Sequence, residues 1–380
     1  MFQYQSLANI IFGWDTVAGA GAEIKKYGSK ALLVTGRHSA KATGLLQTIA
    51  EQLDHEGVEW VLFDQVTPNP LVSTVMDGAE MMNREKCDVV VGIGGGSIMD
   101  ASKSIAFMAL SEGDPEDYTF LRRTVEKAYP LVLIPTTCGT GSEVNGIAVL
   151  SNEETKDKTS VISPHLVAKA SIIDPKLMTT MPKSSYASVA FDALCHLMEA
   201  YLTKLHNPMA DCLARRGIEL MSKNLVRVYN DYECREGWEA VTWASTLGGL
   251  TLNSVGIFAP HGMEHPLSGL RNVTHGKGLA AITPAIFDAT IPEYAERFAY
   301  ISQCFGGKDE TDCGTQIKQL LREIDLCITL EDLGFIESDL DWLAENCLKV
   351  SGFAIEMSPV SFTQKQIREL YKKSMTYNKL

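Results

Sequence analysis

Four histidines and one aspartate in the second half of the chain could together bind a metal ion. Asp192 and His196 lie four positions apart, as do His261 and His265, so each pair would share one face of a helix. His275 follows His265 by ten positions. A carboxylate with two or three imidazoles suits Fe²⁺ or Zn²⁺ and is a poor ligand set for Ca²⁺ or Mg²⁺. A single Asp/His pair is more often an ion pair or hydrogen-bonded pair, and spacing does not decide between His261 and His265 as the ligand.

A glycine-rich loop in the first half is suited to a phosphate group. The apolar run at 88–91 leads into GIGGGSIMD at 92–100. Successive glycines allow a sharp turn and a close approach of phosphate, and a following helix would point free N–H groups at it. The loop matches neither the GxGxxG fingerprint nor a Walker loop. We also expect a capping box, with Ser97 as the N-cap of the helix and Asp100 three positions later.

A second loop, PTTCGTGSE at 135–143, follows another apolar run at 131–134. Its hydroxyl groups suit the ribose, phosphate or amide groups of a ligand. Ligands of open α/β sheets bind where strands end, so two such loops after strands favour a ligand over a plain turn.

The elements that must position these residues change character near the middle of the chain. The first half alternates apolar strands with helices, which indicates a parallel sheet covered on both faces. After Pro182 the pattern is helical to the end. We therefore expect an α/β domain at 1–182 and an all-α domain at 183–380. The predicted strands lie at 31–34, 58–63, 88–91 and 131–134, and the predicted helices of the first half at 45–55, 71–85 and 97–110.

Composition excludes several classes of function. The net charge of −13 argues against nucleic acid or an anionic membrane as the main partner. The nine cysteines are scattered and never spaced as CxxC, which favours reduced thiols in the cytoplasm. MFQYQSLANI at the start lacks the features of a signal peptide. The longest uncharged stretch, 241–260, contains several polar residues and predicts a buried helix rather than a membrane span.

Five motifs in this order resemble those of the iron-containing (group III) alcohol dehydrogenase family, and the resemblance covers essentially the whole chain. They are TPNP at 67–70, GGGSIMD at 94–100, PTTCGTGSE at 135–143, DALCH at 192–196 and HGMEHPLSGLRNVTHG at 261–276. The resemblance implies an N-terminal α/β domain that binds NAD or NADP and a helical domain that holds one divalent metal. It implies hydride transfer between an alcohol or aldehyde and the nicotinamide, with the metal polarising the oxygen.

The resemblance also assigns roles to individual residues. The metal ligands would be Asp192, His196, His261 and His275, with Fe²⁺ (iron) preferred and Zn²⁺ (zinc) second. His265 would lie near the nicotinamide and take part in proton transfer. The pyrophosphate would be held by Gly94, Gly95, Gly96 and Ser97. The rest of the dinucleotide site would be lined by Asn69, Thr136, Thr137, Thr140 and Lys158. We expect a homo-oligomer, a dimer, with a small alcohol or aldehyde as the partner.

The loop after the first predicted strand favours NADP over NAD. An acidic residue after an early strand usually binds the ribose 2′-hydroxyl and would repel a 2′-phosphate. Gly36 stands where members of the family that use NAD commonly have aspartate, and the loop TGRHSAK carries no acid. Arg37, Ser39 and Lys41 offer charge and donors for a phosphate. The alternative is a solvated basic loop without a ligand.

The sequence departs from the family pattern at Phe191, Cys138 and Glu264, where smaller or apolar residues are common. Phe191 and Glu264 could reshape the substrate pocket, whereas Cys138 is interpreted as a small buried residue. Three other functions stay open. They are a dehydroquinate-synthase-like lyase, for which the cleft offers few cations (Arg271 and Lys277), a zinc-dependent polyol dehydrogenase, and a non-catalytic sensor that keeps the fold.

Overall fold

The computed structural model describes residues 8–379, so most of the segment considered for a signal peptide lies outside the described residues. The chain forms two compact units. Among the described residues, one unit comprises 8–155 and 159–180, and the other comprises 156–158 and 181–379. The predicted fold class, an α/β region with a parallel sheet followed by an all-helical region, is confirmed.

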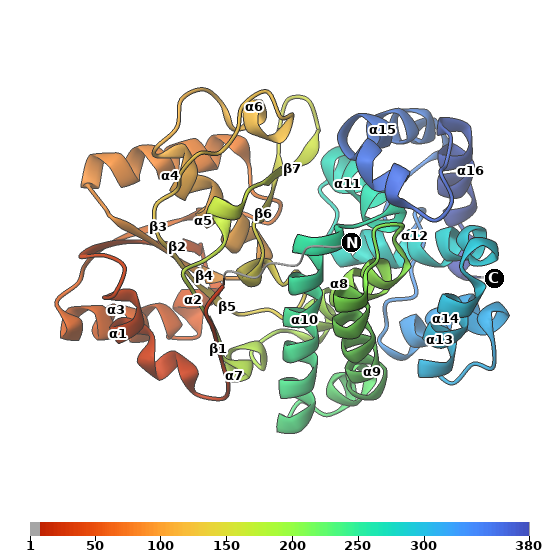
Figure 1. The fold of residues 1–380 in the computed structure, drawn as a ribbon, viewed down its shortest axis with the longest axis horizontal. Coiled ribbons are helices and arrows are strands. Elements are labelled where there is room, and N and C mark those ends of the chain that lie inside the picture. Colours follow the sequence, from red (N-terminus) through yellow and green to blue (C-terminus); the bar gives the residue numbers. More distant parts are fainter. Residues whose placement is uncertain (1–7, 380) are drawn as a thin grey trace. The chain divides into compact units, whose positions relative to one another are not determined.

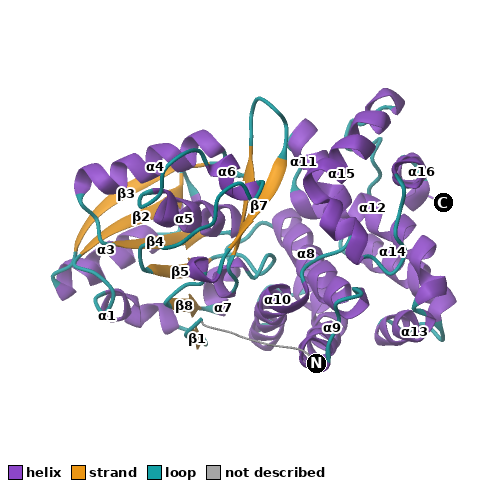
Figure 2. Ribbon diagram, turned by 45° about the horizontal axis from the view of Figure 1, so that its top comes forward, coloured by secondary structure: helices purple, strands orange, loops and turns teal. Residues whose placement is uncertain are grey.

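The first unit is built on a six-stranded sheet with the order β1-β8-β5-β4-β2-β3, in which every pair is parallel. Strands β6 and β7 form a separate two-stranded ribbon (Figure 2). The strands are β1 (Ile10–Phe12), β2 (Lys30–Gly36), β3 (Glu59–Val66), β4 (Val89–Gly94), β5 (Leu131–Pro135), β6 (Ile147–Ser151), β7 (Lys158–Ile162) and β8 (Ala170–Ile173).

Helices cover both faces of this sheet, as Figure 1 shows for α1 and α3 on one side and α4 and α5 on the other. Alternate strand residues face opposite ways because side chains in a strand have a period of two. Leu32 and Val90 pack under α4 and α5, whereas Leu33 and Val91 pack against α1 and α3. The helices of this unit are α1 (Ala20–Ile24), α2 (Ser39–Ala42), α3 (Leu45–Glu56), α4 (Val72–Glu85), α5 (Gly96–Met108), α6 (Pro115–Thr119) and α7 (Pro175–Met178).

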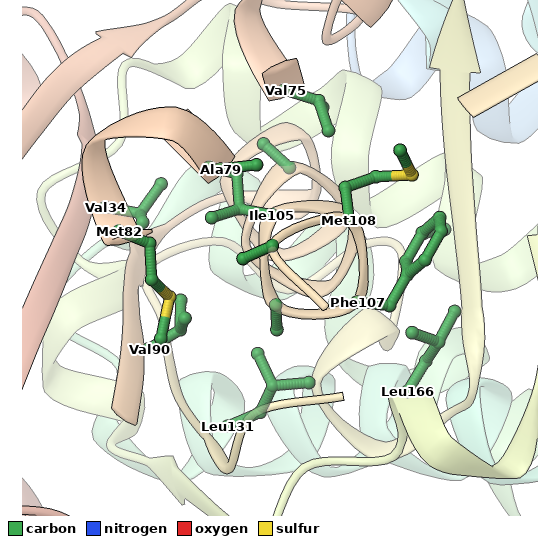
Figure 3. Packing of buried hydrophobic residues seen from close by; sticks show 14 of the residues in the cluster. Val34, Val75, Ala79, Met82, Val90, Ile105, Phe107, Met108, Leu131 and Leu166 are labelled. Carbon is green, nitrogen blue, oxygen red and sulfur yellow. The ribbon is translucent and has the colours of Figure 1, made fainter. Parts of the chain in front are cut away.

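Helix α5 is the most deeply buried helix of the sheet cover. Every side chain from Ile98 to Met108 is buried. Figure 3 shows Ile105, Phe107 and Met108 of α5 surrounded by α4 residues and by strand residues such as Val34 and Leu131. Such packing fixes the helix, and with it the glycine loop at its start.

The second unit contains only helices among the described residues from 181 onward. They are α8 (Lys183–Leu202), α9 (Pro208–Asn230), α10 (Arg235–Val255), α11 (Ala259–Arg271), α12 (His275–Thr290), α13 (Ala295–Cys304), α14 (Cys313–Glu323), α15 (Leu340–Met357) and α16 (Gln364–Ser374). Within residues 8–379, no helix is both long enough and apolar enough to cross a membrane.

Two local predictions were wrong. The uncharged stretch at 241–260 is not one helix, because α10 ends at Val255 and Gly256 has a φ of 63°, a conformation that commonly ends helices. Ser97 is not the N-cap of α5: the N-cap is Gly95, which has no side chain to cap with, and Ser97 lies inside the helix.

Candidate metal and dinucleotide sites

Three helices bring the proposed metal ligands together. Asp192 and His196 lie on α8, His261 on α11 and His275 at the first position of α12. The Oδ1 atom of Asp192 is 3.2 Å from Nε2 of His261 and 3.7 Å from Nε2 of His275. Ligand atoms of these three residues lie within 4.8 Å of one another. The donor set, one carboxylate and imidazole nitrogens, fits a divalent iron or zinc ion.

His196 lies beside this three-residue cluster. Its Nδ1 is 3.6 Å from Oδ1 of Asp192, and its ring stacks on that of His261 with centroids 4.2 Å apart. The helical spacing of four positions therefore places Asp192 and His196 on one face of α8, as the sequence predicts.

Two glutamates contact the far nitrogens of the histidine rings. Oε1 of Glu199 is 2.5 Å from Nδ1 of His261, and its other oxygen accepts from the backbone N–H of Phe258 at 2.9 Å. Glu264 contacts Nδ1 of His275, and both glutamates are fully buried. In each pair the carboxylate holds Nδ1, so Nε2 faces Asp192.

Lys158 lies in the helical unit with this cluster. Its Nζ is 3.4 Å from Glu264 and 3.3 Å from Nδ1 of His275. The sequence placed Lys158 with the dinucleotide residues, whereas its contacts are with the residues around the metal cluster.

Charges in the cluster shift its protonation equilibria strongly. Burial alone would raise the pKa of Asp192, but His196, His261 and His275 lower it. Burial would lower the pKa of His261, yet Glu199 and Asp192 raise it to about 10. In the metal-free protein the cluster therefore holds a proton that a metal ion would displace.

His265 differs from the neighbouring histidines. Its Nδ1 is 3.0 Å from Oγ of Ser351, a residue with non-helical backbone angles inside α15. Burial, followed by the charges of Lys158 and His275, lowers the pKa of His265 well below its usual value. The ring is therefore neutral near pH 7.

The predicted phosphate loops meet at the carboxyl ends of two adjacent strands. Gly94 of β4 is in register with Pro135 of β5, and Thr136 N–H donates to the Gly94 carbonyl at 2.8 Å. A Cβ on Gly96 would lie 2.4 Å from the side chain of Thr140. Glycine is needed here because the two loops touch. The amides of Gly96 and Ser97 begin α5, where a helix has no acceptor of its own for them.

Other predicted dinucleotide residues lie at the same edge of the sheet. Gly36 ends β2, and Asn69 follows β3 with a φ of 52°. The backbone N–H of Asn69 is 3.3 Å from Oγ of Ser97. Thr137 lies beside Gly95, where a Cβ would be 3.1 Å from its hydroxyl oxygen. The structure thus gathers these predicted dinucleotide residues of the α/β unit at one edge of its sheet.

A buried lysine connects α5 to the loop at 135–143, called the threonine loop below. Nζ of Lys103 donates to Ser142 at 2.8 Å, to Asn145 at 3.0 Å and to the Ile147 carbonyl at 2.7 Å. Ser142 in turn donates to Asp100 at 2.6 Å. Burial lowers the pKa of Lys103 to about 8, although Asp100 and Glu143 oppose the shift. Asp100, expected in a capping box, instead binds this loop.

Sequence reasoning did not predict the contacts of Glu199, Glu264 and Ser351. Glu199 could have been found, because positions 192, 196 and 199 follow the i, i+4, i+7 spacing of one helix face. For Glu264 the sequence predicts only an effect on the shape of the substrate pocket. No local signal pointed to Ser351, which lies 86 positions from His265.

Comparison with known proteins agrees with this site chemistry. The family model described as iron-containing alcohol dehydrogenase matches residues 8–175. The model of the C-terminal part of the Fe-containing alcohol dehydrogenase family matches residues 186–375. Together they span most of the chain, and they give no support to the lyase alternative.

Individual relatives cover nearly the full length. A 1,3-propanediol dehydrogenase from Citrobacter freundii is 33% identical over 388 residues, covering 98% of this chain and 99% of its own. The NADH-dependent butanol dehydrogenase B of Clostridium acetobutylicum is 31% identical over 393 residues, with the same coverage of both chains. The structure of an archaeal halo-thermophilic alcohol dehydrogenase from a Red Sea brine pool matches with a TM-score of 0.95 at 33% identity, covering 98% of this chain and 99% of that one. The chain belongs to the iron-containing alcohol dehydrogenase family and is a metal-dependent, NAD(P)-linked alcohol oxidoreductase.

Proposed function

We propose that the protein interconverts a primary alcohol or diol and its aldehyde, with residues 1–182 binding NADP(H) and residues 183–380 holding one Fe²⁺ ion. The observation that carries the proposal is the buried cluster of Asp192, His261 and His275 in a chain that also presents two phosphate-type loops on a parallel sheet. Relatives named for 1,3-propanediol and butanol support small primary alcohols as the substrate class.

The proposed metal ligands are Asp192, His196, His261 and His275, with iron preferred to zinc. When bound, the ion supplies Lewis acidity at the substrate oxygen, and the nicotinamide supplies or accepts the hydride. The protein's own part is to hold these side chains close together. Glu199 and Glu264 keep the rings of His261 and His275 turned so that Nε2 of each faces Asp192.

His265 is the proposed proton-transfer residue. Its contact with Ser351 anchors the ring through Nδ1, so the proposed proton route uses Nε2. The neutral ring has one nitrogen with a free lone pair, and we propose that this nitrogen passes on, rather than stores, the proton that an alcohol releases on oxidation.

For the dinucleotide we propose Gly94, Gly95, Gly96 and Ser97 at the pyrophosphate and Asn69, Thr136, Thr137 and Thr140 around it. Lys158 is kept as a further proposed dinucleotide residue, although its observed contacts are with Glu264 and His275. The helix start at α5 and the hydroxyl-rich loop support this assignment, since both favour phosphate oxygens.

The preference for NADP(H) over NAD(H) rests on Gly36 and its loop. Arg37 and Ser39 are exposed, and Lys41 pairs with Asp64 of β3. The contact with Asp64 offsets part of the positive charge, so Arg37 carries most of the proposed attraction for a 2′-phosphate. One relative is named NADH-dependent, which makes the direct comparison of both cofactors necessary.

We further propose a homodimer located in the cytoplasm. All nine cysteines are free thiols, as suits a reducing compartment. Sedimentation velocity at several protein concentrations tests the dimer.

One experiment tests the central proposal. Protein purified without added metal is analysed for iron and zinc, and turnover is measured on a panel of primary alcohols, diols and aldehydes. Wild type should hold one divalent ion per chain, and His275→Ala should lose metal and turnover while still binding NADPH. Full activity in His275→Ala would refute the ligand assignment.

A further inference from the structure

Glu264 is buried in surroundings that are built to receive a carboxylate. The side chain is fully buried on α11, three positions after His261. Ser268 donates to one of its oxygens, and His275 and Lys158 contact the other. A Cβ on Gly278 of α12 would lie 2.8 Å from Cγ of Glu264, so only a glycine leaves room for it.

Two opposing groups compete for Nδ1 of His275. A carboxylate can only accept a hydrogen bond, so Glu264 requires the ring proton on Nδ1. An ammonium can only donate, so Lys158, 3.3 Å from the same atom, favours a ring without a proton on Nδ1. In the neutral ring, the first arrangement leaves the Nε2 lone pair facing Asp192, and the second places a proton there.

His261 provides a reference within the same molecule. Its Nδ1 is held by Glu199, which is also fully buried, and no lysine contact with this ring is found among the described residues. His275 has both a glutamate and a lysine. Glu264 therefore accepts from Nδ1 of His275 as Glu199 does from Nδ1 of His261, although Lys158 lies within hydrogen-bonding distance of the same atom of His275.

We propose that Glu264 is a positioning residue that fixes the metal-binding tautomer of His275 by outcompeting Lys158 for Nδ1. The inference rests on the proposed function, because it requires His275 to be a metal ligand. It assigns Glu264 to the support of the metal centre rather than to a substrate pocket.

Zn²⁺ affinity, measured by competition with a chromophoric chelator in the absence of dinucleotide, tests the proposal. Glu264→Ala should weaken Zn²⁺ binding about 10- to 100-fold, the range typical for loss of a residue that orients a metal ligand. Replacing Lys158 as well, in Glu264→Ala/Lys158→Met, should recover most of that affinity, because the competing donor is gone. Glu264→Gln, which keeps the size of the side chain, is measured alongside as a second variant for folding.

A matched control is Asp157→Asn. Asp157 is also buried and paired with a lysine, and its carboxylate accepts from Lys349 at 2.6 Å and from Asn346 at 2.8 Å, two groups of α15 rather than of the histidine cluster. Its Zn²⁺ affinity should stay within about twofold of wild type, which separates tautomer control from the general effect of losing a buried carboxylate.

A double-mutant cycle with His275→Ala distinguishes the possible failures. Adding Glu264→Ala to His275→Ala should cause no further loss of Zn²⁺ affinity, since the two act through one ligand. Wild-type affinity in His275→Ala would refute the ligand assignment itself. Loss in His275→Ala with normal affinity in both Glu264 variants, or no recovery on removal of Lys158, would overturn only the role of Glu264.

Discussion

At the scale of single residues, three histidines of one small region have different neighbours, and we propose different roles for them on that ground. His261 and His275 have carboxylates at Nδ1, whereas His265 has the hydroxyl of Ser351. The spacing of His261 and His265 in the sequence does not indicate which of the two binds the metal. The contacts distinguish these two histidines. A carboxylate at Nδ1, as at His261, is typical of a ring that binds a metal, whereas the partner of His265 is an uncharged hydroxyl group.

The different environment of His265 leads to a prediction for its substitution. His265→Ala should retain the metal and lower kcat by roughly 10²-fold, since the proton relay is lost but the ligands are intact. Ser351→Ala should reduce kcat less, because it removes only the anchor of the ring. Metal content by mass spectrometry and steady-state kinetics check both variants. A metal-free His265→Ala would mean that the roles of His261 and His265 must be exchanged.

Gly36 can accept a side chain without strain, which makes cofactor choice testable. A Cβ there would meet only the Val66 carbonyl oxygen at 3.5 Å and Ile98 at 3.6 Å, both ordinary contacts. Gly36→Asp should therefore fold and shift kcat/KM from NADPH towards NADH by about tenfold or more, since a carboxylate repels a 2′-phosphate and binds a 2′-hydroxyl. Gly36→Ala is the control that adds bulk without charge. Equal ratios in wild type and Gly36→Asp would show that this loop does not recognise the 2′-phosphate.

At the scale of elements, two helices near the metal cluster contain internal prolines whose cost is offset by side chains. Pro266 in α11 removes the donor to the Gly262 carbonyl, and the thiol of Cys347 lies 3.4 Å from that oxygen. Pro284 in α12 does the same to the Ala280 carbonyl, which accepts from Asn378 at 2.9 Å. The prolines therefore leave their helices intact.

Asn378 should consequently be important for stability. Its amide donates to the Ala280 and Ile328 carbonyls, and the residue is only 1% exposed. Asn378→Ala leaves both oxygens without this donor and should lower the free energy of unfolding by about 1–3 kcal/mol. Asn224→Ala removes a half-buried amide that donates to the Leu220 carbonyl on α9, and it should lower the free energy of unfolding by less than Asn378→Ala does. Urea unfolding of the two variants measures the difference, and equal losses would contradict the explanation.

The network that joins α5 to the threonine loop predicts a pH dependence of stability. The pKa of Lys103 is about 8 in the folded protein and 10.5 without burial. Between these values the unfolded chain binds more protons, so this lysine makes stability rise as the pH increases from 8 to 10.5. The difference in unfolding free energy between wild type and Lys103→Met should therefore increase by on the order of 1 kcal/mol between pH 8 and pH 10. A difference that stays constant over this range would contradict a neutral Lys103 in the folded state.

Much at this scale was predictable from the sequence, and the exceptions have physical reasons. The strands at 31–34 and 131–134 are apolar because both faces of the sheet are covered, so their pattern is strong. Strands β1 and β8 span only three and four residues and went unpredicted, because so short a run gives no clear period. The prediction of Ser97 as the N-cap was wrong because α5 begins two residues earlier, where the Gly95 carbonyl accepts from the backbone N–H groups of Ile98 and Met99.

At the scale of the whole molecule, the two compact units should respond separately to the two ligands. The metal cluster lies entirely in the helical unit, and the phosphate-type loops lie entirely in the α/β unit. Ligand binding stabilises the folded state by RT ln(1 + [L]/Kd), about 2.7 kcal/mol at a concentration 100 times Kd. Local unfolding of the backbone should therefore become less frequent in the segments that contact the bound ligand.

Hydrogen exchange detected by mass spectrometry can locate these effects. Zn²⁺ added to metal-free protein should slow exchange in α8, α11 and the start of α12, whereas NADPH should slow it at 92–100 and 135–143. Mg²⁺, which the ligand set does not suit, is the control. If Zn²⁺ slowed exchange only at 92–100 and 135–143, the proposal that the helical unit binds the metal and the α/β unit binds the dinucleotide would be contradicted.

The segment Lys156–Lys158 belongs to the helical unit although it precedes α8 in the chain, and this has a consequence for recombination between homologous genes. A chimera joined near residue 182 would inherit Glu264 and His275 from one parent but Lys158 from the other. Suppose that the helical parent carries a small residue at the position of Glu264. The lysine at position 158, inherited from the α/β parent, would then lack a carboxylate partner and would donate to the ring of His275 instead. An exchange that keeps the metal centre intact must therefore transfer residues 156–158 together with the helical half.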